Sequence, residues 1–112
     1  MVHGLLLTPQ AMKRLLNYLI SGTRGGYARA QIIETIKAQQ LNANQLAEKL
    51  GYDYSTIRHH LDVLTENSLL TASGDRYGQV YSIGPELEAN YEIFLLILGK
   101  SGIPERRNGS NP

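Results

Sequence analysis

The sequence of 112 residues contains no cysteine. This absence excludes disulfide bridges, thiolate metal sites and cysteine nucleophiles. Long apolar runs are also missing, because the longest unbroken one, Ile93 to Leu98, has six residues, far fewer than the ~20 that span a bilayer. The first residues lack the basic, apolar and small-residue pattern of a secretory signal. We therefore expect a cytoplasmic protein with no membrane partner, and the length predicts one compact domain.

The chain has no strong excess of either charge. Eleven Lys and Arg residues balance ten Asp and Glu residues, for a net charge of +1, whereas nucleic-acid-binding domains are often much more basic. The surplus is uneven, since residues 1–84 carry 8 basic and 6 acidic side chains and residues 85–112 carry 3 and 4. A nucleic-acid-binding protein of this composition would depend on a few well-placed contacts.

Helical periodicity and glycine or proline punctuation predict five helices and one β-hairpin. Thr8-Pro9 is typical of a helix start, Ser21-Gly22 of its end, and Gly25-Gly26 of a flexible joint after it. Asn42 and Gln45 have the spacing of a capping box. The remaining elements are predicted as helices over about 28–40, 43–50, 54–67 and 86–99 and strands over 69–73 and 79–83.

This order of elements is the plan of a winged helix-turn-helix. The fold class is therefore predicted to be mainly α with a small β-hairpin wing, and with flanking N- and C-terminal helices. We expect an N-terminal helix and glycine joint over residues 1–26, the winged helix-turn-helix over 27–84, a C-terminal dimerisation helix over 85–99 and a flexible tail over 100–112.

Two stretches carry a resemblance to a known family. The first is NANQLAEKLGYDYSTIRHHLDVL, residues 42–64, and the second is the hairpin with Leu69-Leu70, Gly74 and Tyr77-Gly78-Gln79-Val80-Tyr81. Together they resemble the helix-turn-helix and wing of ArsR-type regulators, and they are especially similar to small archaeal winged-helix regulators. The resemblance covers about 29–83, and it implies a transcriptional regulator that binds double-stranded DNA.

The resemblance places the DNA contacts on the outward side of the helix over 54–67, at Tyr54, Ser55, Thr56, Arg58, His59 and Asp62. Among them Arg58 is suited to read guanine, because its forked guanidinium can bond O6 and N7 together. Asp62 has two open roles, to restrain Arg58 from one turn away or to accept a hydrogen bond from cytosine. At the hairpin tip, Arg76 and Tyr77 are predicted wing contacts.

The sequence predicts neither a metal site nor a cofactor. His59 and His60 are adjacent, so they point about 100° apart on a helix, and we expect one to face DNA while the other packs at the helix edge. ArsR-type metal sites use a cysteine pair or histidine and carboxylate ligands on the last helix, and here Glu86, Glu88 and Glu92 have no histidine beside them. Nucleotide-binding and GxSxG motifs are also absent, which argues against an enzyme. No polar cluster identifies an effector.

The last predicted helix has apolar side chains on all sides, including a 4-3-4 spacing typical of helix pairing. We expect a twofold homodimer that presents two recognition helices to half-sites about 34 Å apart. The alternative is that this helix caps the winged domain of its own chain. The predicted interface residues come from the first and last helices and are Leu15, Leu19, Leu87, Tyr91, Phe94, Leu95 and Leu98.

A second function class remains open from the sequence. Some winged-helix domains act as protein-interaction modules in larger complexes, without direct DNA readout. Such a module would show an apolar patch on the recognition face, whereas Tyr54, Arg58 and His59 favour nucleic acid.

Overall fold

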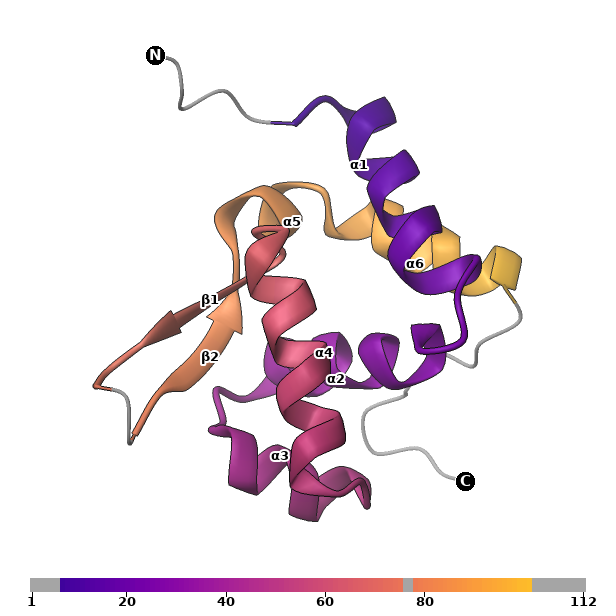
Figure 1. Ribbon diagram of the computed structural model, residues 1–112. Helices are drawn as coiled ribbons and strands as arrows, with labels where there is room; N and C mark the ends of the chain where they lie inside the picture. The colour runs from indigo at the N-terminus through magenta and orange to yellow at the C-terminus, as the bar shows by residue number, and fades with distance from the viewer. Residues whose placement is uncertain (1–6, 76–77, 102–112) are drawn as a thin grey trace.

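The computed structural model describes residues 7–75 and 78–101, and Figure 1 shows their arrangement. Helix α4 runs through the middle of the view with α2 and α3 packed against it, and α3 lies at the lower edge. The β-hairpin lies on one side of α4, and helices α1 and α6 cross each other on the other. The elements follow the predicted order and are α1 (Pro9–Leu16), η1 (Asn17–Ser21), α2 (Gly26–Ala38), α3 (Ala43–Leu50), α4 (Tyr54–Glu66), β1 (Leu70–Ser73), β2 (Val80–Ile83), α5 (Pro85–Ala89) and α6 (Tyr91–Ser101).

The first helix begins as predicted but changes its winding before it ends. The Thr8 hydroxyl accepts a hydrogen bond from the Ala11 amide at 3.0 Å, which confirms the predicted N-cap. From Asn17 the helix widens into the π-turn η1, closed by a bond from the Gly22 amide to the Asn17 carbonyl at 2.8 Å. The Ser21 hydroxyl also donates to the Asn17 side chain at 2.7 Å. Such π-turns are uncommon and lie frequently at functional sites.

The glycine pair after η1 does not act as a flexible joint. Gly26 is the buried first residue of α2, and a Cβ at this position would overlap the backbone carbonyl of Ile20. The pair therefore permits a close crossing between η1 and α2, which fixes the first helix against the rest of the chain.

The helix-turn-helix follows the local signals in the sequence. Asn42 and Gln45 form the predicted capping box at the start of α3, with reciprocal bonds of 2.8 and 2.9 Å. Gly51 ends α3 in the left-handed conformation at φ 79°, where glycine has no steric penalty. The short turn that follows sets α4 across α2 and α3.

Strands β1 and β2 form an antiparallel hairpin in which Leu70 pairs with Ile83 and Ser73 with Val80. The hairpin is joined to the helical part through Tyr81, whose amide donates to the Leu41 carbonyl at 3.0 Å. The wing is thus held at its base by the segment between α2 and α3.

The single helix predicted over 86–99 is two helices in the structure. The first of them, α5, begins at Pro85, close to the predicted start, but it ends at Ala89 with Asn90 as its C-cap, and α6 follows directly. The Asn90 side-chain amide donates to the Glu86 carbonyl at 2.9 Å. The Asn90 backbone carbonyl accepts from the Ile93 amide at 2.9 Å. A side chain that satisfies the last carbonyls of one helix competes with its continuation. Helix α6 then runs to Ser101, and residues 102–112 of the predicted tail lie outside the described residues.

One hydrophobic core joins the terminal helices to the helix-turn-helix. Met12 and Leu16 from α1, Ile33 from α2, Leu61 from α4 and Phe94 from α6 are all fully buried in it. Helix α6 therefore packs on α1 and η1 of its own chain, which is the intramolecular cap that the sequence left open. No helix in residues 7–75 and 78–101 has the length and apolar character needed to cross a membrane.

Candidate nucleic-acid interface

Helix α4 projects its polar face because its other face is fixed in the core. Ile57, Leu61 and Leu64 are completely buried at i, i+4 and i+7. Asp53 caps the first turn, with its carboxylate accepting from the Thr56 amide at 3.3 Å. Hydrogen bonds from Thr56 also lower the pKa of the Asp53 carboxyl. These contacts fix both the rotation and the start of α4.

The predicted contact residues on α4 do not share one orientation. Tyr54, Ser55, His59 and Asp62 are exposed, and 49% of the Tyr54 surface is accessible. Thr56 and Arg58 are half-buried on opposite flanks of this exposed face. The two predicted wing contacts, Arg76 and Tyr77, lie outside the described residues.

Arg58 connects α4 to the wing. Its Nη1 donates to the Tyr81 hydroxyl on β2 at 2.7 Å, and its Nη2 donates to the Asp62 carboxylate at 3.1 Å. The second bond is an i, i+4 ion pair and confirms the role of Asp62 as a restraint on Arg58. A guanidinium has five N–H groups, so Arg58 is positioned by two bonds and retains other donors for a nucleic acid.

The opposite flank of α4 holds a buried polar pair that sequence reasoning missed. Arg29 on α2 is only 8% exposed and His60 on α4 only 6%. Arg29 Nε donates to His60 Nδ1 at 3.2 Å, and its Nη1 donates to the Leu19 carbonyl in η1 at 2.8 Å. One buried guanidinium therefore links the π-turn, α2 and α4.

The electrostatics of this pair follow from its burial. Burial, together with the charge of Arg29 and the proximity of His59, lowers the pKa of His60. An Nδ1 that accepts a hydrogen bond carries no proton, so His60 is neutral in this arrangement. Burial also lowers the pKa of Arg29. A signal for the pair exists in the sequence, because Arg29 lies at i−3 to Ile32 and His60 at i+3 to Ile57, and both positions fall on apolar helix faces.

His59 and His60 divide as predicted, with His59 exposed and His60 packed inside, and their ring centroids are 5.3 Å apart. In the part of the chain that the structure describes, no three metal-ligating side chains come together. Glu88, one of the three glutamates considered as ligands, instead forms an ion pair with Lys37 at 2.8 Å.

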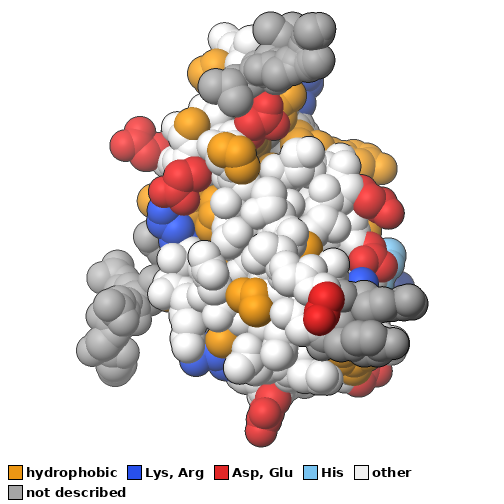
Figure 2. Space-filling model, turned by 90° about the vertical axis from the view of Figure 1, so that its left-hand side faces the viewer, with side chains coloured by type: hydrophobic (Ala, Val, Ile, Leu, Met, Phe, Trp, Pro, Cys, Tyr) orange, Lys and Arg blue, Asp and Glu red, His pale blue; other side chains and the backbone are white. Residues whose placement is uncertain are grey.

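Figure 2 shows the side of the molecule that carries the wing. Uncharged side chains and backbone dominate this face, and acidic and basic side chains are scattered over it. The described residues form no continuous basic stripe here. This distribution agrees with the small net charge of +1, and any nucleic-acid contact on this face depends on individual groups.

The predicted dimer residues separate into two groups. Leu19, Leu87, Phe94 and Leu98 are buried in the core of the single chain, so they have no surface to offer a second copy in this conformation. The partly exposed residues of the predicted set are Leu15, Tyr91 and Leu95.

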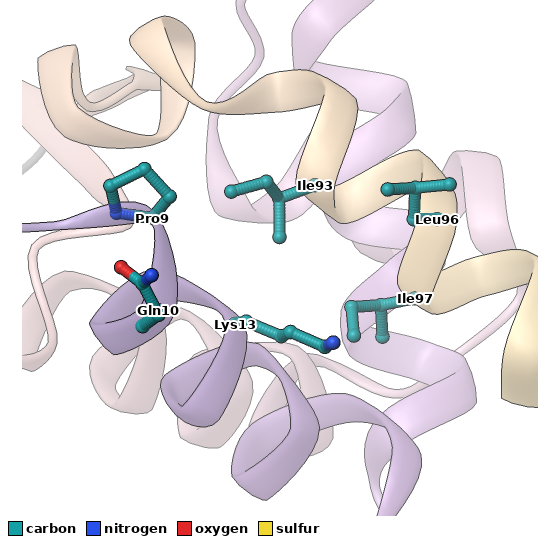
Figure 3. A pocket seen from close by; sticks show the side chains of 6 residues that line it. All are labelled: Pro9, Gln10, Lys13, Ile93, Leu96 and Ile97. Atoms are coloured by element: carbon teal, nitrogen blue, oxygen red, sulfur yellow. The ribbon is translucent and has the colours of Figure 1, made fainter.

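The outer face of α6 carries a different apolar residue, Leu96, of which 65% is exposed. It lies over an apolar groove between α1 and α6. As Figure 3 shows, the groove is lined by Pro9, Gln10 and Lys13 from α1 and Ile93, Leu96 and Ile97 from α6.

Comparisons with known proteins agree with this architecture. The family model described as "Bacterial regulatory protein, arsR family" matches residues 27–71, from α2 to the first strand. A search of the curated proteins finds no match.

Solved structures match over most of the chain. The transcriptional regulator HlyU from Vibrio vulnificus is 24% identical with a TM-score of 0.59, over 78% of this chain and 86% of that one. The reduced HlyU from Vibrio cholerae is 20% identical with a TM-score of 0.59, over 78% and 87%. Mb0332 from Mycobacterium bovis, described as a homodimeric winged helix-turn-helix DNA-binding domain and a possible ArsR-family regulator, is 15% identical with a TM-score of 0.60, over 97% and 100%.

The fold and the exposed polar face of α4 define a winged helix-turn-helix protein. Within that class, residues 27–71 match the family model of bacterial regulatory proteins of the ArsR family.

Proposed function

We propose that this chain is a transcriptional regulator that binds double-stranded DNA as a homodimer, with α4 in the major groove and the β1–β2 hairpin as its wing. The observation that carries the proposal is the ArsR-family match over residues 27–71, combined with a polar, exposed face on α4. A helix fits the width of the major groove, and exposed polar side chains at its start reach base edges.

The contacts divide by their chemistry. The Arg58 guanidinium is positioned by hydrogen bonds to Tyr81 and Asp62, and it is the group proposed to contact a DNA base. Ser55 and Thr56, in the first turn of α4, are suited to phosphate oxygens. Tyr54, His59 and the wing tip complete the proposed contact surface.

The groove between α1 and α6 is the proposed dimer surface. Leu96 exposes a large apolar side chain beside the half-buried Ile93, and exposed apolar patches mark interaction sites. The similarity to a homodimeric domain over 97% of this chain supports a second copy as the occupant.

Selection of DNA sequences from a random duplex pool by the purified chain tests the function. We expect a twofold symmetric consensus whose half-site centres are about 10 base pairs, or ~34 Å, apart. Affinity should fall steeply with salt. A pool that shows no enrichment at low salt would contradict DNA readout and favour a protein-interaction module.

Sedimentation at tens of micromolar tests the dimer. We expect the wild-type chain to sediment as a dimer and Leu96→Glu as a monomer, because a charge at this position would be desolvated in the interface. The matched control is Ala72→Glu, which adds the same charge to an exposed apolar residue of the wing and should leave the dimer intact. A dimeric Leu96→Glu variant would exclude this surface as the interface.

A further inference from the structure

An open hollow lies between the start of α2 and the flank of α4 that faces away from the wing. It has a volume of about 540 Å³, far more than the ~30 Å³ of one water molecule. The floor is formed by Arg29 and His60, and the rim includes Arg24, Tyr27 and His59. The residues that line it include no Asp or Glu. The hollow therefore gathers cationic and hydrogen-bonding groups without a carboxylate to balance them.

Among the described residues, no carboxylate compensates the charge of Arg29 in this hollow. Its guanidinium is buried, and its hydrogen-bond partners, His60 Nδ1 and the Leu19 carbonyl, are both neutral. The ion pairs formed among residues 7–75 and 78–101 do not include Arg29. A buried charge is costly unless it is paired. An anion bound at the floor of the hollow would supply the partner that Arg29 does not have among the described residues.

Gly25 keeps the floor accessible. A Cβ at this position would lie 2.7 Å from His60 Cε1 and 3.0 Å from Arg29 Nη2. The Nη2 atom thus borders the space that a larger residue at position 25 would fill. The absence of a side chain here creates room for a ligand atom beside the guanidinium.

We propose that this hollow binds an oxyanion, a phosphate or carboxylate group seated against Arg29 and held at the rim by Arg24 and His59. Guanidinium groups bind such anions through short, charge-assisted hydrogen bonds. Tyr27, which is 50% exposed, adds an aromatic surface beside the seat. Because Arg29 also bonds α4 through His60, an occupant would be coupled to the position of the recognition helix.

Two kinds of ligand supply an oxyanion of this chemistry. One is a phosphate of the DNA backbone, because His59 lies on the exposed face of α4 together with Ser55. The other is a small free anion. Only the first source depends on the proposed function.

Titration of the full chain with inorganic phosphate at pH 7.5 and constant ionic strength tests the site. We expect saturable NMR shifts at the His60 ring and the Arg29 Nε–H group.

Gly25→Ala should remove the saturable binding, and Arg24→Gln, on the exposed rim, should weaken it about tenfold. Gly99→Ala is the matched control, because a Cβ there has open space around it and phosphate binding should be unchanged. Linear shifts in the wild type, or equal binding by wild type, Gly25→Ala and Arg24→Gln, would overturn the proposal.

Duplex DNA then identifies the source. If the seat takes a backbone phosphate, Arg24→Gln should reduce the salt slope of DNA binding by about one, whereas Arg14→Gln, on exposed α1, should not. If phosphate shifts persist in the DNA complex and the slope is unchanged, the occupant is a free anion. Failure to bind any DNA would overturn the proposed function and leave the phosphate titration as an independent test of the site.

Discussion

Each flank of α4 has an arginine, Arg58 from α4 itself and Arg29 from α2, and the two are bound in opposite ways. On the wing side, Arg58 is partly exposed, is paired with the Asp62 carboxylate and bonds Tyr81 across the surface. On the other side, Arg29 is buried and bonds only neutral partners in the described residues. A paired surface arginine contributes little to stability but is available to a ligand, whereas a buried arginine with hydrogen-bonded neighbours holds elements together. The Arg58 flank is therefore expected to contact bases, whereas the Arg29 flank sets the position of the helix and forms the proposed anion seat.

Leu61→Ala should have the largest effect on the free energy of unfolding, because it truncates a core side chain that packs beneath both flanks of α4. Leu61 is fully buried beneath α4, and such a truncation costs about 2–5 kcal/mol of unfolding free energy. Urea denaturation measures the change. Glu66→Ala, on the exposed face of the same helix, should stay within about 0.5 kcal/mol. Equal effects of the two substitutions would contradict the burial of this face.

Arg29→Ala should destabilise the fold by about 1–3 kcal/mol, because the Leu19 carbonyl and His60 would lose a buried hydrogen-bond partner. The matched substitution Arg58→Ala should cost no more than about 1 kcal/mol, since its ion pair is exposed to solvent. The same denaturation experiment compares them. If Arg58→Ala were the more destabilising, the assignment of the two flanks would be reversed.

DNA affinity should separate Arg58 from its neighbours on α4. We expect Arg58→Ala to weaken binding to the selected DNA by about 1–3 kcal/mol and to relax specificity at one base position. Fluorescence anisotropy on matched and mismatched duplexes measures both quantities, with Glu66→Ala as the control. Unchanged affinity and specificity would mean that the Arg58 guanidinium serves only to hold the wing.

The parts of this comparison that sequence could predict are local ones. Spacing predicted the capping box at Asn42, and it gave the restraint of Arg58 by Asp62 as one of two open roles. Each of these depends on residues within a few positions of one another.

The parts that sequence did not predict depend on distant partners or on local competition. The Arg29–His60 bond joins residues 31 positions apart and the Arg58–Tyr81 bond residues 23 apart. Helical periodicity can place Arg29 and His60 on buried faces, but it does not tell which distant residues meet. At Asn90, a side chain that bonds the backbone ended a helix that the apolar pattern alone would continue. The apolar pattern of α6 also could not distinguish core from interface, because both are lined by the same residue types.

The smallest expected effect is the pH dependence that the buried flank alone should show. The pKa of His60 is lowered in the folded chain by burial, by Arg29 and by His59. Between this lowered value and the unfolded value near 6.5, the unfolded state binds more protons, so stability falls as the pH decreases. Above the unfolded pKa both states are neutral and His60 contributes no slope. One proton limits the slope to about 1.4 kcal/mol per pH unit. Urea denaturation from pH 7.5 downward should show this loss in the wild type and, to a smaller extent because His59 contributes to the lowered pKa of His60, in His59→Gln. In His60→Gln, an amide oxygen can still accept from Arg29 without titrating, so this part of the slope should disappear. A slope that survives in His60→Gln would place its origin away from the buried flank.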